Sequence, residues 1–186
     1  VIVSGNDFYS SPRLRPDGSL LAWLTWNHPN MTWDGTELWL GKLNDKGSIV
    51  EKQKIAGREH ESICQPEWSP AGDLYFVSDC TGWWNLYRRR QTEIEALCSM
   101  QAEFGHPHWV FGTRLYDFAS EKTIVCSYTG NGRDYLAILE TDTGTLRQIE
   151  RPFTGIVQVH CTGDRVIFIG ASPTSSSSIV LWNLRA

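Results

Sequence analysis

The chain has 186 residues, of which 41% are hydrophobic, 20% charged and 12% aromatic, so it can bury a core and is not a disordered segment. Its 17 basic and 21 acidic residues give a formal charge of −4, and we expect no nucleic-acid partner. The longest apolar runs, such as 166–169, fall far short of the ~18 residues that a membrane span needs, so no membrane association is expected.

Five cysteines are spaced irregularly, with no C-x-x-C pair and no histidine at metal-finger distance. They are Cys64, Cys80, Cys98, Cys126 and Cys161. The sequence therefore predicts no metal, no cofactor and no disulfide framework, and we expect reduced thiols in the cytoplasm. No basic segment followed by an apolar one marks a secretory signal, and a start at Val1 rather than methionine leads us to expect an excerpt from a longer protein.

Short apolar runs separated by turn residues follow one another along the chain, and this pattern predicts strands joined by turns. In chain order the runs are 20–24, 37–40, 74–78, 85–87, 124–126, 135–139, 166–169 and 179–182. Asp34-Gly35 and Asn131-Gly132 are strong hairpin signals, because both central residues of such a turn need positive φ. The window 93–100 has the apolar spacing of a helix, but it lies where an internal repeat requires a strand, and we predict a strand there.

The internal repeat is the most informative feature of the chain. Segment 65–78 aligns with segment 11–24 without a gap at an offset of 54, and the two prolines, the glycine and the apolar run coincide. A degenerate third copy follows at an offset of 50, and a fourth begins near Ile156 at an offset of 42. Repeats of this length indicate an array of similar supersecondary units.

Each unit carries three or four predicted strands whose polarity rises along the unit. The second strand is apolar on both faces, which requires cover on both sides, as in sheets that stack radially. The last strand is short and polar, as in 49–53 and 146–149, and suits an outer edge. These features predict an all-β fold, a β-propeller of about four four-stranded antiparallel blades.

One propeller segment is predicted to fill residues 1–186, without a hydrolase domain. Its blades are expected at approximately 6–57, 58–104, 105–152 and 153–186, with 1–5 as the outer strand of a preceding or closing blade. Two arrangements remain open. Either Val1-Ile2-Val3 pairs with 179–181 to close a four-bladed ring, or the chain is an arc of a larger ring, which we favour.

Three segments resemble the propeller domain of the prolyl oligopeptidase family of serine peptidases, and in particular its dipeptidyl aminopeptidase and acylaminoacyl-peptidase branch. They are 11–18 (SPRLRPDG), 27–39 (NHPNMTWDGTELW) and 79–88 (DCTGWWNLYR). The segment 168–174 is similar to the last blade of that branch, just before its hydrolase domain. The likeness spans essentially the whole chain.

In this family an α/β-hydrolase domain carries the catalytic serine on a G-x-S-x-G turn. The chain has no such motif, since 170–174 lacks the second glycine and lies in a predicted loop. The resemblance therefore implies a propeller without catalytic residues, inactive alone, that gates access and orients short peptides for a hydrolase domain of the same serine peptidase. A self-standing propeller used as a protein-interaction scaffold, and the remnant of a truncated gene, stay open as alternatives.

The loops after each second strand share one rim with the links between blades, because the strands of a blade run up and down. This rim collects aromatic and acidic residues, a mixture that suits a peptide with a free ammonium terminus. The candidate substrate-binding residues are Trp33, Asp34, Glu61, Trp83, Trp84, Asn85, Glu103 and Phe104. The structural alternative, which we favour for the tryptophans, is that they wedge between blades, with Asp34 as a turn former.

Two further groups receive structural interpretations. His28, His106 and His108 have no nucleophile or orienting carboxylate at a recognisable spacing, so we interpret them as loop residues. The arginine run 88–90 alternates between the faces of a strand, and at least one of its side chains is expected against a neighbouring blade.

Overall fold

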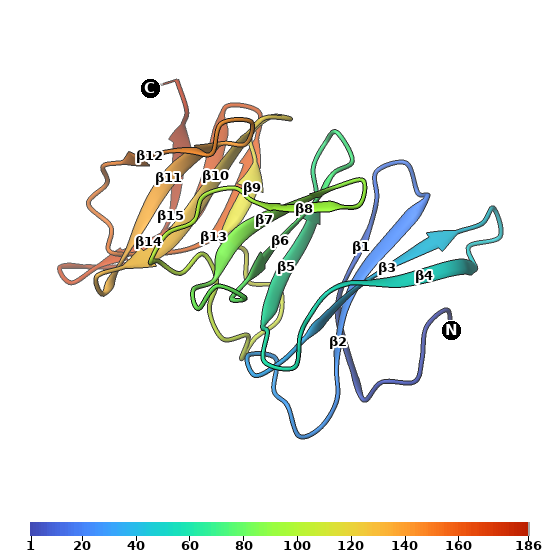
Figure 1. Cartoon of the computed structure of the whole chain (residues 1–186). Coiled ribbons are helices and arrows are strands. Elements are labelled where there is room, and N and C mark those ends of the chain that lie inside the picture. Colours follow the sequence, from blue (N-terminus) through green and yellow to red (C-terminus); the bar gives the residue numbers. More distant parts are fainter. Residues whose placement is uncertain (186) are drawn as a thin grey trace.

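The structure, a computed structural model, describes residues 1–185 and contains fifteen β-strands and no helix within them (Figure 1). The strands form four antiparallel sheets that follow one another along the chain. The first three sheets have four strands each, in sequence order, and the last has three. The predicted all-β architecture of about four antiparallel blades is confirmed.

The sheets are numbered here in chain order. Sheet 1 consists of β1 (Phe8–Leu14), β2 (Leu20–Trp26), β3 (Glu37–Leu43) and β4 (Ile49–Ala56). Sheet 2 consists of β5 (Ile63–Trp68), β6 (Leu74–Ser78), β7 (Asn85–Arg90) and β8 (Glu93–Ala96). Sheet 3 consists of β9 (Tyr116–Phe118), β10 (Thr123–Gly130), β11 (Arg133–Glu140) and β12 (Thr145–Ile149), and sheet 4 of β13 (Gly155–Thr162), β14 (Arg165–Ser172) and β15 (Ser175–Asn183). β8 lies in the window whose apolar spacing alone resembles a helix.

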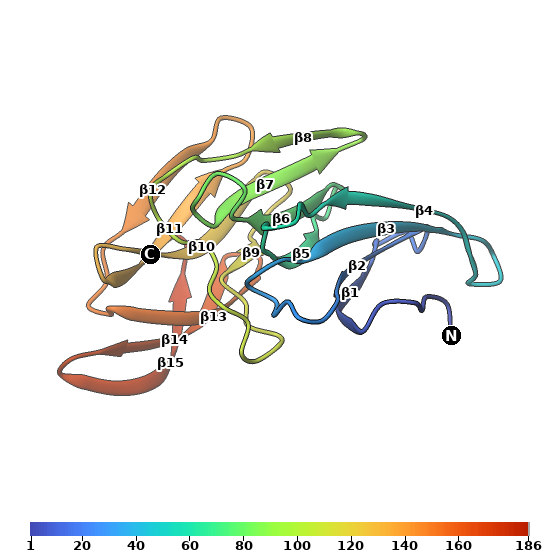
Figure 2. The same cartoon turned by 60° about the horizontal axis from the view of Figure 1, so that its bottom comes forward.

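The four sheets stand side by side in an arc. Figure 2 shows the outer strands β4, β8 and β12 on one side of the arc and the inner strands β1, β5, β9 and β13 on the other. Inner strands of neighbouring sheets touch, β1 with β5 and β9 with β13. The two chain ends lie at opposite ends of the arc (Figure 1).

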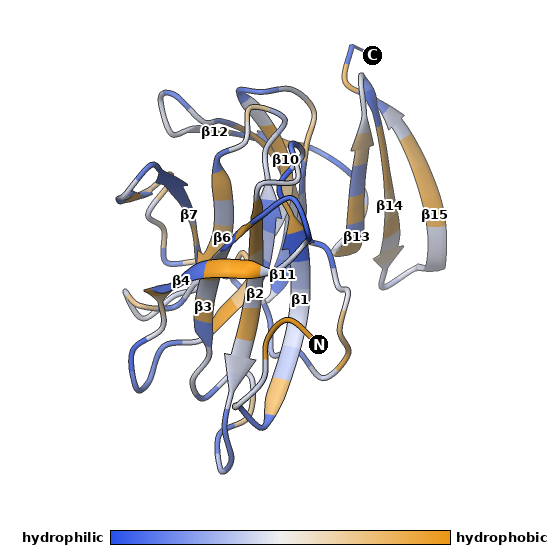
Figure 3. Ribbon diagram, turned by 90° about the vertical axis from the view of Figure 1, so that its right-hand side faces the viewer, coloured by the Kyte–Doolittle hydropathy of each residue, from blue (hydrophilic) through white to orange (hydrophobic). Residues whose placement is uncertain are grey.

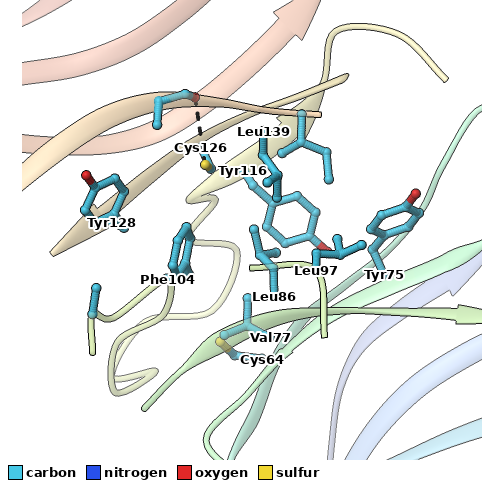
Figure 4. Packing of buried hydrophobic residues seen from close by; sticks show 13 residues of the cluster. Cys64, Tyr75, Val77, Leu86, Leu97, Phe104, Tyr116, Cys126, Tyr128 and Leu139 are labelled. Carbon is cyan, nitrogen blue, oxygen red and sulfur yellow. Dashed lines mark hydrogen bonds between the residues drawn. The ribbon is translucent and has the colours of Figure 1, made fainter. Parts of the chain in front are cut away.

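The core lies between neighbouring sheets rather than within one of them. Between sheets 1 and 2, Leu24 packs in one buried cluster with Phe76. The cluster of Figure 4 joins Leu86 of sheet 2 to Tyr116 of sheet 3, and a third cluster brings Phe168 of sheet 4 against sheet 3. Each such side chain stabilises the fold by about 1.5–3 kcal/mol through burial, so the contacts between sheets hold the arc together.

The fourth sheet differs from the others because one of its two faces is left uncovered. The second strands β2, β6 and β10 are buried along most of their length on both faces, as predicted, whereas β14 alternates between buried and exposed residues. Ile167 and Ile169 on β14 and Ile179 and Leu181 on β15 are exposed, and Figure 3 shows hydrophobic segments on this sheet at the end of the arc. The prediction of double cover is wrong here, because no sheet within the described chain packs on that face.

The N-terminal segment bears on the closure of the ring. Val1–Val3 form no strand and do not pair with β15, so these residues do not close a four-bladed ring, and an outer strand of a preceding blade over 1–5 stays a prediction. Instead these residues line a cavity of about 310 Å³ on sheet 1 together with Tyr9 and Trp23.

One of the two predicted hairpin turns forms. Asn131 and Gly132 have φ of 52° and 76° and connect β10 directly to β11, as predicted. Asp34-Gly35 makes no tight hairpin, because a loop of ten residues separates β2 from β3. Gly35 is required for a different reason, since a Cβ atom there would lie 2.8 Å from the backbone oxygen of Glu59.

Candidate functional site

Loops and links between sheets meet on one rim of the arc, at the lower edge of Figure 1. This linker rim consists of the loops 27–36, 79–84 and 131–132 and the links 57–62, 97–115 and 150–154. Backbone hydrogen bonds join them: Thr36 N donates to Glu61 O at 2.9 Å, and Phe104 N donates to Trp84 O at 2.7 Å. Asp134 N, on β11 next to the third loop, donates to Thr154 O at 2.9 Å. Each loop thus holds the link that enters the next sheet.

Glu61, a candidate peptide ligand, is buried with only 5% of its surface exposed. Its carboxylate accepts hydrogen bonds from Gly57 N at 3.1 Å, Arg58 N at 2.9 Å and Ser78 Oγ at 2.6 Å. These three donors belong to the same link and to the neighbouring strand β6. The carboxylate therefore fixes the link between sheets 1 and 2 and leaves no surface for a peptide.

Asn85 and Glu103 hold the next link in the same way. The buried Asn85 amide donates to Met100 O at 3.1 Å, and its oxygen accepts from Met100 N at 2.9 Å. Glu103 Oε2 accepts from Trp84 N at 2.8 Å, and the backbone of Glu103 bridges Thr129. Both side chains therefore hold the link between sheets 2 and 3 against sheet 2, and the backbone of Glu103 joins this link to sheet 3.

Phe104 and Trp84 belong to the packing between sheets 2 and 3. Phe104 is 1% exposed, and its ring centroid lies 5.2 Å from that of Tyr128 (Figure 4). Trp84 packs partly buried against the same cluster, and its indole N–H has no hydrogen-bond partner in the part of the chain that the structure describes. As expected in the structural alternative, Trp84 wedges between blades, and Phe104 does the same.

Three candidates remain at the surface of the linker rim. Trp83 is 39% exposed. Asp34 is exposed, and its Oδ2 accepts from Met31 N at 2.8 Å, so it stabilises a turn. Trp33 is half-buried beneath Trp109, with ring centroids 4.2 Å apart. Of the eight candidates, these three present side-chain surface that a peptide could touch.

The strap, residues 105–114 of the link between sheets 2 and 3, was not singled out as a binding element in the sequence. It reaches across to sheet 1, where Trp109 packs on Trp33 and the ring centroid of Phe111 lies 6.0 Å from that of Trp26. An apolar run inside a link, where polar residues are usual, was the available signal. The strap leads into sheet 3 and contacts sheet 1, and these two sheets are not neighbours in the arc.

The strap completes an aromatic surface in which the rings of Phe8, Trp109 and Phe111 are exposed, Trp33 is half-buried and Trp26 is buried. Trp26 also stacks on Phe8, with ring centroids 5.3 Å apart. We call this the aromatic rim surface, and its members are Phe8, Trp26, Trp33, Trp109 and Phe111. Trp109 is 76% exposed and Phe111 56%, so their rings are available to an apolar partner.

A polar cavity of about 420 Å³ adjoins the aromatic rim surface and shares Trp26 with it. Its lining includes Asn27, His28, Asn30, Glu37, Lys54, Arg58 and Glu59. Glu37 pairs with Lys54 at 3.2 Å, whereas Arg58 and Glu59 have no ion-pair partner within the described residues. The volume suits a small ligand, and charges of both signs suit the two ends of a short peptide.

A ladder of charges along the inner strands was missed in the sequence. Glu67 Oε1 accepts from Arg13 Nε at 2.9 Å and lies 3.4 Å from Arg114 Nη1. Arg114 Nη2 lies 3.1 Å from Asp117 Oδ1, and Asp117 Oδ2 accepts from Cys161 N at 2.8 Å. The ladder joins the inner ends of all four sheets. Apart from Arg114 and Asp117, its members lie too far apart in sequence for a local pattern to reveal them.

The histidines of the strap are not arranged for catalysis. Burial lowers the pKa of His106 and of His108, which keeps both rings neutral near pH 7. Within residues 1–185, no group of three or more His, Cys, Asp or Glu side chains is placed to hold a metal ion. The same residues include no helix with the length and apolarity of a membrane span.

The chain is similar to several solved structures of peptidases. A puromycin hydrolase is 34% identical with a TM-score of 0.89, and the match covers 96% of this chain and 27% of the hydrolase. A puromycin-hydrolyzing peptidase of Mycobacterium tuberculosis is 33% identical with a TM-score of 0.91, covering 98% of this chain and 28% of the peptidase. No family model and no curated protein sequence matches the chain.

A third structure extends the likeness of fold. Prolyl oligopeptidase B of Galerina marginata is 13% identical, with a TM-score of 0.75 over 100% of this chain and 26% of the enzyme. The chain is therefore a β-propeller segment of the type found in prolyl oligopeptidase-family peptidases. In sequence it resembles the two puromycin-hydrolysing enzymes, and it spans little more than a quarter of their length, 27% and 28%.

Proposed function

We propose that this chain is the non-catalytic propeller part of a prolyl oligopeptidase-family serine peptidase, where it gates access to an α/β-hydrolase domain and orients short peptides. The observation that carries the proposal is the 33–34% identity to two puromycin-hydrolysing peptidases over 96–98% of the chain. The missing G-x-S-x-G turn supports the division of labour, because the chain lacks the serine elbow on which the family's chemistry depends.

The linker rim offers the features that orientation of a peptide requires. The aromatic rim surface supplies rigid apolar area for a side chain, and the adjoining cavity supplies charged groups for the peptide termini. The strap lies on this rim and contacts sheet 1 through Trp109 and Phe111, and in the proposed function it restricts access to short substrates. Trp33, Asp34 and Trp83 keep their proposed role in peptide contact, while Glu61, Trp84, Asn85, Glu103 and Phe104 hold the rim in shape.

The alternative is a self-standing propeller used as a scaffold. Such a protein has to protect the edges of its sheets, because an exposed apolar edge strand promotes aggregation. Here β15 has one neighbour in the described chain, and Ile179 is 81% and Leu181 63% exposed. These exposed side chains favour a propeller that continues into further sheets.

The test uses the purified chain with two measurements. Aminoacyl- and dipeptidyl-p-nitroanilides should show no turnover above buffer, and cleavage that a serine-directed inhibitor blocks would contradict the proposal. Calorimetric titration with a phenylalanine-containing tripeptide should give binding that Trp109→Ala weakens by about 2- to 12-fold, as expected for loss of one aromatic contact. Val50→Ala, which truncates an exposed side chain on the outer strand β4, is the control and should leave binding unchanged. Equal binding by both variants would remove peptide orientation from the proposal.

A further inference from the structure

Three consecutive arginines at the end of β7 have different surroundings. Arg88 Nη2 lies 2.7 Å from Glu95 Oε1, and Arg90 Nε lies 3.1 Å from Asp73 Oδ2. The Arg89 guanidinium between them has no ion-pair or hydrogen-bond partner in the part of the chain that the structure describes, although the side chain is half-buried. Burial alone lowers the pKa of Arg89, and no neighbouring carboxylate offsets the desolvation.

Strand alternation explains where Arg89 lies. Tyr87 belongs to the cluster between sheets 1 and 2, so Arg89, two residues further along β7, faces the same space. There it lines a cavity of about 320 Å³ whose other walls come from both sheets. The lining residues are Arg15, Leu20, Leu40, Gln53, Trp68, Gly72, Asp73, Arg89 and Gln91. Gly72, Asp73 and Gln91 place the cavity beside the β5–β6 and β7–β8 turns. Figure 1 shows these two turns on the rim opposite the linker rim.

The other charges at this cavity are already balanced. Asp73 is held by Arg90, which lies outside the cavity lining. Arg15, which lines the cavity, pairs with Asp17, which does not; Arg15 Nη1 lies 3.3 Å from Asp17 Oδ2. One positive charge, that of Arg89, is left over. A half-buried guanidinium without a counter-charge favours an anionic ligand, because its own desolvation is otherwise uncompensated.

The remaining walls select the kind of anion. Leu20, Leu40 and Trp68 give the cavity an apolar side, and Arg15 lies over the Trp68 ring with its guanidinium carbon 5.8 Å from the centroid. Arg15 Nε donates to Gly72 O at 3.1 Å, which fixes its orientation. A small inorganic anion would leave this apolar side uncovered.

We propose that this cavity between sheets 1 and 2 binds a carboxylate carried on an apolar body, such as the C-terminal residue of a peptide. Arg89 pairs with the carboxylate, for which the planar guanidinium is suited. Leu20, Leu40 and Trp68 cover the apolar side chain. The site lies on the other rim from the one assigned to peptide orientation, so it extends the proposed function and does not depend on it.

The test is calorimetric titration of the 186-residue chain with N-acetyl-phenylalanine, its neutral amide, acetate and inorganic sulfate. N-acetyl-phenylalanine should bind at least about ten-fold more tightly than its amide, because the amide lacks the charge. It should also bind at least about ten-fold more tightly than acetate or sulfate, because these anions lack the apolar body. Equal binding of acid and amide, or of acid and sulfate, would overturn the proposal. An N-acetylated tripeptide ending in phenylalanine tells whether the source is a peptide or a single acylated amino acid.

Variants localise the site. Arg89→Gln should weaken binding of the acid about ten-fold or more, and Arg89→Lys should retain part of it because the charge remains. Arg147→Gln is the matched control, since Arg147 on β12 is exposed, has no ion-pair partner among the described residues and lines neither this cavity nor the one on the linker rim. Unchanged binding by Arg89→Gln refutes the assignment. If Arg89→Gln does not fold, the preference for the acid over the amide is measured on Arg89→Lys and on the original chain. A smaller preference in Arg89→Lys supports the assignment, and an equal preference refutes it.

Discussion

Removal of the Glu61 carboxylate tests the view that the links between sheets are held by buried side chains. Glu61→Ala leaves three donors, Gly57 N, Arg58 N and Ser78 Oγ, without their acceptor. Hydrogen bonds to a charged group contribute about 1.5–3 kcal/mol each, and their effects on one group are not additive. We expect a loss of about 3–5 kcal/mol in the free energy of unfolding, because the buried donors lose their acceptor at about 1–3 kcal/mol each, combined less than additively.

Thermal unfolding followed by circular dichroism measures this loss. For a chain of this size it corresponds to a fall of about 6–20 °C in Tm. Glu59→Ala, an exposed carboxylate two residues away, is the control and should change the unfolding free energy by less than about 0.5 kcal/mol. Glu61→Gln keeps one oxygen acceptor and should lie between the two. If Glu61→Ala costs no more than Glu59→Ala, the buried carboxylate does not hold the link, and the account of the linker rim is refuted.

Three further predictions concern the strap and its neighbours. Gly105→Ala should lower the free energy of unfolding by about 1–3 kcal/mol in denaturant titration, because a Cβ atom would lie 2.8 Å from Cys64 Sγ. In the folded chain a thiol reagent should label the exposed Cys80 well before Cys64, whose pKa is raised by burial; equal rates would contradict this burial. Burial lowers the pKa of His106 and His108 below about 6.5, the ordinary value that they keep in the unfolded chain. On acidification the unfolded chain therefore binds more protons than the folded chain, and the free energy of unfolding should fall as the pH is lowered from about 7 to about 5. Replacing both histidines with glutamine should flatten this pH dependence.

The repeated strand pattern was sufficient to predict the architecture, because it reflects local backbone and burial requirements. The doubly apolar second strands β2, β6 and β10 are covered on both faces, whereas β14 is not, and Asn131-Gly132 allows the backbone of a tight turn. Asp34-Gly35 shows where local rules fail. There the loop is longer, and the glycine serves a close approach to another link, which is a tertiary requirement that no dipeptide encodes.

The candidate site was predictable only in part, because topology places a residue on a rim without fixing the direction of its side chain. Glu61 and Phe104 lie on the linker rim as the topology requires, yet both side chains turn inward. The aromatic rim surface depends on contacts between Trp109 and Trp33, which are far apart in sequence. Arg89 differs from its neighbours only in the face of β7 that it occupies, so its missing counter-charge is visible only in three dimensions.

The strap also bears on the mechanics of the arc. It is anchored between sheets 2 and 3 but touches sheet 1, so bending at the joint between the first two sheets would pull Trp109 away from Trp33. The contact of Phe111 with Trp26 would be strained by the same movement. Opening in that direction therefore costs about 0.5–1.5 kcal/mol for each ring pair. The strap therefore stabilises the curvature of the arc over sheets 1 to 3. Shortening the strap would make this part of the arc more flexible without changing any strand.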